Sequence, residues 1–324
     1  MKNSFKFLMV FFLFGSYLYA QNQLNSSDVN HYELLKKINL NYLKDGSKAK
    51  KTLDSLQPIL IKNANDSLLG LYFRVLSNVK SNQLEKEAAL KEIDKSIRYF
   101  KKAKNKRGEV LSSLNKGNLF LMKGETKLAM KIYSEALFEA QKNDLKYEEA
   151  ILCKNIGVLF FNQNKTQEAL SQYQRALKIF LRINNVKEIA NTYTNIGNVY
   201  YNEYDSKNAL LNYNKAMKLT SQIKDSVNLA KLCNNIGSVY IDDEHDTIKG
   251  LSYLLKSLDL KTKLNEKNDL IFAYENLATV YIGLKKFDLA EDYLKKANDM
   301  ALKSGNKEEL KEIYENYSLL YEGK

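Results

Sequence analysis

Hydrophobic residues recur along most of the chain at intervals of three and four positions, which is the spacing of one face of an α-helix. Short polar stretches such as KGET (123–126), QNKT (163–166) and EYDSK (203–207) interrupt this pattern. The pattern therefore predicts an all-α protein built from pairs of amphipathic helices that are joined by polar turns.

One of these segments, NTYTNIGNVYYN at 191–202, carries asparagine at four positions of a single helical stripe: Asn191, Asn195, Asn198 and Asn202. Asparagine is a weaker helix former than alanine by about half a kcal/mol, so the stripe costs the helix about 2 kcal/mol. A cost of this size indicates that the four side chains have a role.

A six-residue motif recurs six times with a period of 40 or 41 residues. Its copies are NKGNLF (115–120), NIGVLF (155–160), NIGNVY (195–200), NIGSVY (235–240), NLATVY (276–281) and NYSLLY (316–321). Small and then large residues follow at fixed spacing, namely Ala129, Ala169, Ala209, Gly250 and Ala290, then Tyr133, Tyr173, Tyr213, Leu254 and Leu294. Small residues let the first helix (A) and the second helix (B) of a pair approach closely, and the aromatic residues fill the space between neighbouring pairs.

This repeat resembles the tetratricopeptide repeat (TPR), in a version of about 40 residues instead of about 34. The resemblance covers residues 110–324, where the last repeat is incomplete, and implies a right-handed α-solenoid of antiparallel helix pairs, the TPR superhelix. Weaker copies occupy 21–109, with pairs at about 70–103 and 30–62, and Pro58 bends or ends the latter. We therefore expect seven helix pairs and then a single A helix over about 307–322.

Polar residues stand before several of the predicted A helices, where their side chains can accept hydrogen bonds from unpaired backbone N–H groups. We expect N-caps at Asp144, Asn185, Asp225 or Ser226, Asp269 and Asn306.

The N-terminus reads MKNSFKFLMVFFLFGSYLYAQNQ, with Lys2 and Lys6 before an apolar run from Phe7 to Phe14. This run is shorter than the roughly 20 residues that a transmembrane helix needs. Residues 1–20 are therefore predicted to be a signal peptide that is cleaved after Ala20 and directs the chain to export, into the periplasm or facing it.

Charge and composition narrow the class of function. The net charge is +12, and it becomes +10 when Lys2 and Lys6 leave with the signal peptide. Lysines are scattered among glutamates on helix surfaces, so nucleic acid is not an expected partner. His31 and His245 belong to different repeats, and the sequence has no catalytic motif, no phosphate-binding loop and no Cys/His metal cluster. We therefore expect neither an enzyme nor a cofactor.

Two further features have a simple packing or solvation explanation. Cys153 and Cys233 lie two repeats apart, which is about 16–20 Å at the usual spacing of packed helices, whereas a disulfide needs Cα atoms within roughly 7 Å. We expect both to be buried packing residues. The turn DDEHDT (242–247) is a weak candidate for a divalent cation site, and the alternative is a solvated turn. Its candidate ligands are Asp242, Asp243, Glu244, His245 and Asp246.

We number each unit so that the small A-helix residue is position 8. Positions 4, 7, 8 and 11 then form the core face, and positions 2, 6, 9 and 13 lie opposite. By the TPR resemblance, this opposite face lines a concave groove, which grades from partly apolar through amide-rich to acidic. The predicted ligand-binding residues are Asn115, Asn118, Asn155, Asn162, Asn191, Asn195, Asn198, Tyr201, Asn202, Lys231, Asn235, Asn276 and Asn316.

Position 6 is asparagine in six consecutive units, and we call this set the asparagine ladder. Two interpretations of the ladder stay open. A carboxamide offers one acceptor and two donors, so the ladder can pair with the backbone of an extended peptide, as a similarity to kinesin light chains implies. Alternatively, these asparagines bond to the neighbouring repeat. For Asn191, Asn198 and Asn202, which most units lack, we expect ligand contact. Only Lys154 and Lys231 come near the face, so an acidic C-terminal tail is not the expected ligand.

We expect an exported, non-enzymatic module that binds a protein or an extended peptide segment. A signal peptide followed by long TPR repeats resembles the sensory regions of bacterial two-component histidine kinases and helix-turn-helix regulators, where a transmembrane helix and an effector domain follow. Membrane contact is expected only through such a C-terminal anchor. The alternative is a standalone periplasmic scaffold for envelope assembly or secretion. The sequence stops at Lys324, where earlier repeats enter the A–B turn, which favours natural continuation over a capping last helix.

Overall fold

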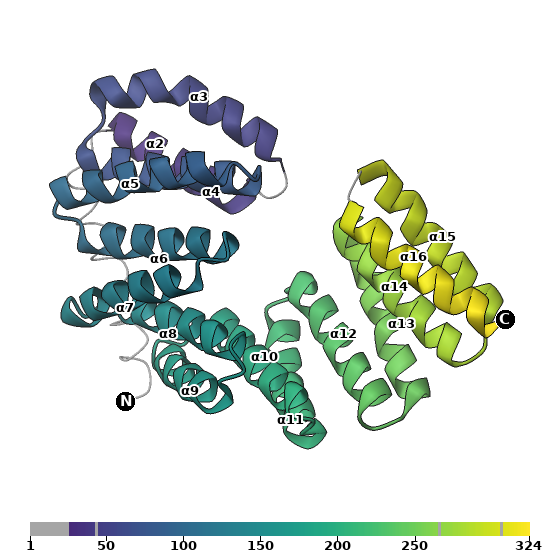
Figure 1. Cartoon of the computed structure of the whole chain (residues 1–324). Coiled ribbons are helices and arrows are strands. Elements are labelled where there is room, and N and C mark those ends of the chain that lie inside the picture. Colours follow the sequence, from purple (N-terminus) through teal and green to yellow (C-terminus); the bar gives the residue numbers. More distant parts are fainter. Residues whose placement is uncertain (1–25, 43–44, 265–266, 305–306) are drawn as a thin grey trace. The chain divides into compact units, whose positions relative to one another are not determined.

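A computed structural model describes residues 26–42, 45–264, 267–304 and 307–324. These residues form fifteen α-helices and no β-strand (Figure 1), which confirms the predicted all-α fold. None of the helices within these ranges is long and apolar enough to cross a membrane. The predicted signal peptide, residues 1–20, lies outside the described residues.

The helices form seven A–B pairs followed by a single A helix, as the repeat spacing predicts. The A helices are α2 (Ser26–Asn41), α4 (Asp66–Asn82), α6 (Lys106–Met122), α8 (Lys146–Phe161), α10 (Val186–Asn202), α12 (Ser226–Asp242), α14 (Lys267–Gly283) and α16 (Lys307–Gly323). The B helices are α3 (Gly46–Asn63), α5 (Lys86–Lys102), α7 (Thr126–Lys142), α9 (Thr166–Arg182), α11 (Ser206–Gln222), α13 (Thr247–Leu264) and α15 (Phe287–Ser304). Pro58 lies inside α3, which continues to Asn63, so the proline does not end that helix.

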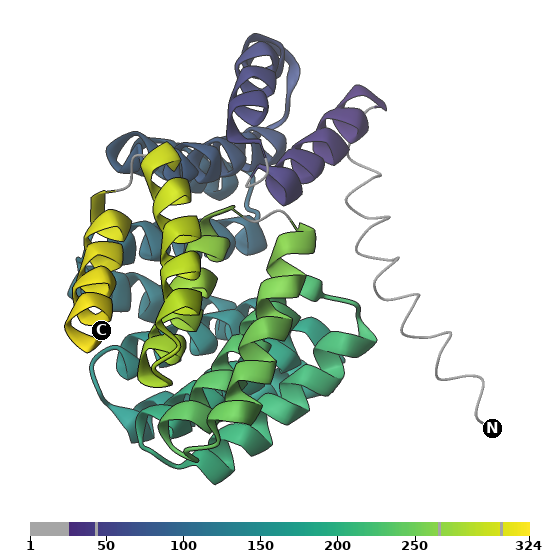
Figure 2. The same cartoon turned by 90° about the vertical axis from the view of Figure 1, so that its right-hand side faces the viewer.

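The chain divides into two compact units, Met1–Ile156 (unit 1) and Gly157–Lys324 (unit 2). In unit 1, Leu53 of α3 packs in one core with Tyr72 and Val75 of α4. In unit 2, α14, α15 and α16 lie side by side in both views, where α15 and α16 are the yellow helices near the C-terminus (Figures 1 and 2).

Most of the described turns between helices are short because one residue in each adopts the left-handed conformation; the turn between α3 and α4 has none. Ten residues with φ between 53° and 78° occupy this place: Leu84, Lys104, Gly124, Asp144, Asn164, Asn184, Tyr204, Lys224, His245 and Lys285. In the turn after α5, the N–H of Asn105 bonds to the carbonyl of Phe100 (2.9 Å) and the N–H of Lys104 to that of Lys101 (3.0 Å), which is the Schellman pattern of a helix end. Asn105 then caps α6 by accepting a hydrogen bond from the N–H of Gly108. The end of one helix and the start of the next therefore share a turn of three residues.

This turn geometry decides which predicted caps are right. Asn185 and Asp225 are N-caps, as expected, and each accepts a hydrogen bond from a backbone N–H three residues later. Asp144 was wrongly predicted as a cap, because it is the left-handed residue that closes α7, with φ 54°. Asp269 was also wrongly predicted, because it lies within the first turn of α14. Asn306 lies outside the described residues.

The A and B helices of three pairs meet where a tyrosine ring lies directly on a glycine. The pairs of residues are Gly117 with Tyr133, Gly157 with Tyr173, and Gly197 with Tyr213. A Cβ atom at Gly197 would lie 2.5 Å from Cε1 of Tyr213, closer than any van der Waals contact allows. The three tyrosines are fully buried, as are Ala129, Ala169 and Ala209 on the B helices. The small residues at these positions thus have the packing role that the repeat predicts.

Two expected core positions behave differently in α16. Tyr314 at position 4 and Tyr321 at position 11 are more than half exposed. Leu320 and Ile313 on the same helix are fully buried, because the described part of the chain covers α16 only where α14 and α15 pack against it.

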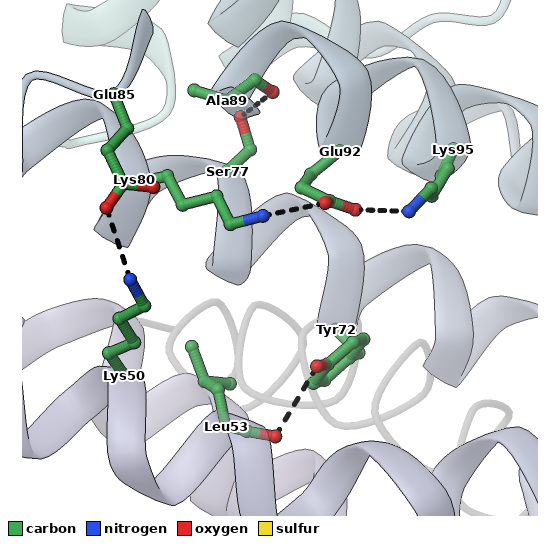
Figure 3. A network of polar contacts seen from close by, with 9 residues as sticks. All are labelled: Lys50, Leu53, Tyr72, Ser77, Lys80, Glu85, Ala89, Glu92 and Lys95. Carbon is green, nitrogen blue, oxygen red and sulfur yellow. Dashed lines mark hydrogen bonds and ion pairs between the residues drawn. The ribbon is translucent and has the colours of Figure 1, made fainter. Parts of the chain in front are cut away.

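Polar contacts join α3, α4 and α5 in unit 1 (Figure 3). Glu92 lies between Lys80 and Lys95, with N–O distances of 2.8 and 2.9 Å. Burial by itself raises the pKa of Glu92, but the two lysines outweigh that effect and hold the pKa below its usual value. The hydroxyl of Ser77 also donates to the carbonyl of Ala89 at 2.8 Å. The charge of the buried Glu92 is thus neutralised by one lysine on its own helix, α5, and by one on the neighbouring helix α4.

We predict that Gly197→Ala destabilises the protein by up to about 2 kcal/mol. The added methyl group must displace the Tyr213 ring, at a cost of about 1–3 kcal/mol, whereas alanine regains about 1 kcal/mol of helix propensity. Chemical denaturation measures the difference. Gly283→Ala is the matched control, because nothing lies within 4 Å of the Cβ that it would add. Equal stability of the two variants would contradict this account of the A–B contact.

Candidate functional site

The predicted ligand-binding asparagines lie on the A helices, except Asn162 in the turn after α8, and most of them are partly buried. We call the thirteen predicted residues the amide face and describe its members in each unit separately. Its members in unit 1 are Asn115, Asn118 and Asn155. Its members in unit 2 are Asn162, Asn191, Asn195, Asn198, Tyr201, Asn202, Lys231, Asn235, Asn276 and Asn316. The hydrogen bonds of each residue decide whether its carboxamide is available to a ligand.

In unit 1, the position-6 asparagines bond to the preceding A helix. Nδ2 of Asn155 on α8 donates to Oδ1 of Asn118 on α6 at 3.2 Å. Nδ2 of Asn115 on α6 donates to Oδ1 of Asn78 on α4 at 2.8 Å. Asn78 was not among the predicted residues, although its spacing of 37 residues from Asn115 equals that between Asn118 and Asn155. That shared spacing is the signal by which the sequence reveals such a pair.

The same pairing occurs in unit 2, and a buried tyrosine takes part in it. Oδ1 of Asn198 on α10 accepts hydrogen bonds from Nδ2 of Asn235 on α12 (3.0 Å) and from the hydroxyl of Tyr213 on α11 (2.7 Å). In unit 1, Asn118 likewise accepts from the Tyr133 hydroxyl. Burial raises the pKa of Tyr213, so its hydroxyl stays protonated and donates. Asn198 thus has a structural role, whereas the sequence predicted that it contacts a ligand.

The pairing changes towards the C-terminus of unit 2. Nδ2 of Asn276 on α14 donates to Oδ1 of Asn234 on α12 at 3.0 Å, a spacing of 42 residues instead of 37. The hydroxyl of Thr279 donates to Oδ1 of Asn316 on α16 at 3.4 Å. Five of the six position-6 asparagines therefore have a hydrogen-bond partner on a neighbouring A helix.

Asn195 is the exception. The residue 37 positions before it is Val158 on α8, which has no polar group to accept a hydrogen bond. Among the residues that the structure describes, Asn195 has no side-chain hydrogen-bond partner, although it is partly buried. The chain of hydrogen bonds between position-6 asparagines and neighbouring A helices is therefore interrupted at α10, where the carboxamide of Asn195 is unused.

Neighbouring members of the amide face are available in the same way. Asn191 is half-buried, and Asn162, Asn202 and Lys231 are exposed. Within the described ranges, none of these four side chains has a hydrogen bond or an ion pair. Tyr201 differs, because its hydroxyl donates to Asp242 of α12, and burial followed by this carboxylate raises its pKa. The unused side chains thus lie in the turn after α8 (Asn162), along α10 (Asn191, Asn195 and Asn202) and on α12 (Lys231).

The residues of the acidic turn have separate local roles. Asp242 accepts from Tyr201, Asp243 accepts from the hydroxyl of Ser206 at 3.2 Å, and Asp246 caps α13 by accepting from the N–H of Lys249. Glu244 is exposed, and His245 is the left-handed residue of the turn. Over the described part of the chain, no three His, Cys, Asp or Glu side chains are arranged to hold a metal ion. Cys153 and Cys233 are both buried, and no disulfide joins them.

One buried carboxylate was missed by the sequence analysis. Glu275 on α14 is 5% exposed, and neither of its carboxylate oxygens has a hydrogen-bond partner among the described residues. Burial, followed by repulsion from Glu312 and Glu309 of α16, raises the pKa of Glu275 to about 7. Sequence pattern alone does not identify this residue, because its burial depends on how α14 packs against neighbouring helices.

Comparison with known proteins agrees with this architecture. The family model described as tetratricopeptide repeat matches residues 228–303. The model described as soluble NSF attachment protein, SNAP, matches residues 79–247, which is more than half of the chain. The chain therefore belongs to the tetratricopeptide repeat proteins and to the helical-repeat family that the SNAP model describes. No curated protein matches the chain significantly.

Several solved structures share the fold. A Rap protein complexed with competence and sporulation factor is 15% identical, with a TM-score of 0.66 over 87% of this chain and 77% of that chain. Aspartyl phosphate phosphatase F from Bacillus subtilis is 16% identical, with a TM-score of 0.64 over 86% and 72%. The Rap conjugation gene regulator of plasmid pLS20, in complex with a Phr peptide, is 19% identical, with a TM-score of 0.61 over 84% and 71%. At these identities the likeness is one of fold.

We predict opposite effects for two asparagines on α10. Asn198→Ala should cost about 2 kcal/mol of stability, because it removes the acceptor of Asn235 and leaves the buried Tyr213 hydroxyl unpaired. Asn195→Ala should change stability by less than about 0.5 kcal/mol, because no hydrogen bond is lost and helix propensity improves. Urea denaturation of both variants checks this. A large loss in Asn195→Ala would show that the Asn195 side chain has a structural role.

We also predict that Glu275→Gln stabilises the protein at pH 8 but not at pH 5. The folded-state pKa is raised, so the folded protein binds more protons than the unfolded chain between about pH 4.5 and 7. The stability associated with the protonated carboxyl is complete below pH 4.5 and is lost as the pH rises through about 7. The difference at pH 8 should be about 1–3 kcal/mol. Glu315→Gln, at an exposed ion pair with Lys311 on α16, is the control and should show no such pH dependence.

Proposed function

We propose that this protein is a non-enzymatic binding module that holds an extended protein or peptide segment on the amide face of unit 2. The observation that carries this proposal is the unused carboxamide of Asn195, where Val158 interrupts an otherwise paired ladder. Asn191 and Asn202 on the same helix, and Asn162 in the turn after α8, add further amides that are unpaired within the described residues. Each offers two donors and one acceptor, which match the C=O and N–H groups of an extended backbone.

The position of these amides favours ligand binding over simple solvation. Asn191 and Asn195 lie on α10, whose opposite face is fixed by Ile196, Gly197 and Val199 in the core. Their side chains therefore project from a rigid helix, and partial burial restricts their rotamers before a ligand arrives. A backbone-directed site of this kind accepts many sequences, and specificity then depends on the pockets and charges around it.

The comparisons supply an independent reason to expect a peptide. Two of the structures with the same fold are complexes, one with competence and sporulation factor and one with a Phr peptide. We transfer from them only the class of ligand. The residues that would hold it here are those of the amide face that are not engaged in the ladder.

We further propose that the module is exported and serves as the sensory or scaffold part of a signalling system. The apolar run after Lys2 and Lys6, followed by Ala20, supports a signal peptide. Export is checked by expressing the full chain in a Gram-negative host and measuring the mass of the periplasmic product. The expected mass is that of a chain that begins at Gln21. A product that retains Met1 in the cytoplasm would refute the export step.

The binding proposal predicts the outcome of selection from a phage-displayed random dodecapeptide library. Wild-type protein should enrich peptides that bind the Asn191→Ala/Asn195→Ala double variant at least 10-fold more weakly, at unchanged melting temperature. Resynthesised peptides and fluorescence anisotropy give the affinities. If no peptide is enriched, or if the double variant binds equally well, the amide face of unit 2 is not the binding site.

Val158→Asn provides a second, complementary variant. It places a carboxamide 37 residues before Asn195, at the spacing of the paired rungs. The new side chain should accept from Asn195 and from the hydroxyl of Tyr173, as Asn118 and Asn198 do in their repeats. We expect retained stability together with weaker peptide binding. Full binding in this variant would mean that the unpaired state of Asn195 is irrelevant to the ligand.

A further inference from the structure

Two buried glutamates of unit 1 are each paired with a cation. Glu92 is 7% exposed and contacts Lys80 and Lys95. Glu148 is 2% exposed and accepts from Nε of Arg107 at 2.5 Å. These pairs follow the general rule that a charge removed from water needs an opposite charge or several hydrogen bonds. A buried charged group that lacks both is an exception with a specific cause.

Arg74 on α4 is such an exception. Its side chain is partly buried, and its Nε atom is fully buried without a hydrogen-bond partner. Within the described ranges, no hydrogen bond or ion pair involves its guanidinium group. Burial lowers the pKa of Arg74 from its usual value, but arginine keeps its proton in proteins. Helix α4 therefore holds a cation whose donors are unused by the described part of the chain.

Two side-chain hydrogen bonds join α4 to α6, one on each side of Arg74. They run from Nδ2 of Asn105 to Oγ of Ser67 (3.3 Å) and from Nδ2 of Asn115 to Oδ1 of Asn78 (2.8 Å). The two bonds span 38 and 37 residues, so the same spacing places Leu111 of α6 alongside Arg74. Leu111 is partly buried and apolar, and it offers no counterion to the guanidinium group.

The charge and shape of the guanidinium group define the ligand group that fits. Arg107 and Glu148 already form an ion pair with each other, so Arg74 contributes one further positive charge. A carboxylate supplies one negative charge and two coplanar oxygens that match the parallel N–H groups of a guanidinium. Phosphate carries up to two negative charges, which is more than Arg74 leaves uncompensated. Leu111 suits the carbon chain that bears a carboxylate.

We propose that Arg74, with Leu111 beside it, forms a site in unit 1 that receives the carboxylate group of a ligand. The carboxylate belongs either to an acidic side chain of a protein segment or to a small organic acid, and the two sources share the chemistry that Arg74 recognises. The site is separate from the unpaired amides of the proposed function, because Arg74 and Leu111 belong to unit 1 and those amides to unit 2.

NMR of the full chain, labelled with isotopic nitrogen in arginine alone, tests the site directly. The chain has five arginines, which are Arg74, Arg98, Arg107, Arg175 and Arg182. Each Nε–H signal is assigned with an Arg→Lys variant. The probes are sodium hexanoate, the blocked peptide acetyl-Ala-Glu-Ala-amide and inorganic phosphate, each of which replaces chloride at constant ionic strength.

We expect hexanoate or the glutamyl peptide to shift the Arg74 signal saturably, at a concentration at least 10-fold below that needed for Arg98, which is exposed on α5. The more effective of the two probes identifies the source of the carboxylate. A shift of Arg74 that needs as much carboxylate as Arg98 overturns the site. Phosphate that acts at the same concentration as the carboxylates overturns the assignment to a carboxylate.

Thermal denaturation gives a second readout. Arg74→Met removes the charge and keeps an apolar stem, so it should raise the melting temperature in chloride and abolish the stabilisation that the effective carboxylate gives to wild-type protein. Arg98→Met is the matched control and should keep that stabilisation. A lower melting temperature of Arg74→Met in chloride, or an unchanged response to the carboxylate, overturns the site. Peptide binding through Asn191 and Asn195 in unit 2 stands or falls separately.

Discussion

The contact between a tyrosine ring and a glycine backbone sets the geometry on which the rest of the repeat depends. Because Gly197 has no side chain, α11 approaches α10 closely enough for Tyr213 to lie on its backbone. That approach carries the tyrosine hydroxyl to Asn198, whose oxygen also accepts from Asn235 of the next pair. A packing contact inside one pair thereby positions a hydrogen bond between two pairs, and the spacing of 37 residues follows from it.

The consequence is visible where the tyrosine is absent. In the pair α12/α13, Leu254 replaces tyrosine, and Gly250 replaces the usual alanine. A Cβ at Gly237 would lie 2.9 Å from Cδ2 of Leu254 and 3.1 Å from the carbonyl oxygen of Gly250, so the close approach persists without a hydroxyl. The next rung, Asn276, then bonds to Asn234 at a spacing of 42 residues. Loss of the hydroxyl thus accompanies a change of hydrogen-bond partner in the ladder.

The sequence predicted the helices, the pairing and the buried small residues because each depends on local periodicity and on contacts that repeat every 40 residues. It could not choose between a structural and a ligand-binding ladder, because both need asparagine at position 6. The residue 37 positions earlier distinguishes the two cases. Before Asn155 it is Asn118, which accepts a hydrogen bond from Asn155, and before Asn195 it is Val158, which cannot. The Asp144 cap was wrong because the Schellman turn places the polar residue one position before the cap. Glu275 depends on the packing of two A helices, which no single-helix pattern encodes.

The asparagine stripe on α10 can now be divided by its energetics. Each asparagine costs the helix about half a kcal/mol. Asn198 recovers this cost, because one hydrogen bond to a buried hydroxyl contributes about 1 kcal/mol and a second adds to it. Asn191, Asn195 and Asn202 recover nothing within the described structure, because they make no side-chain hydrogen bond there. Glu275 on α14 is similar, because within the described residues its buried carboxylate oxygens also have no hydrogen-bond partner. Polar groups that lack a partner on rigid, well-packed helices are residues whose partners a ligand can supply, and on α10 these are amides that match the groups of an extended backbone.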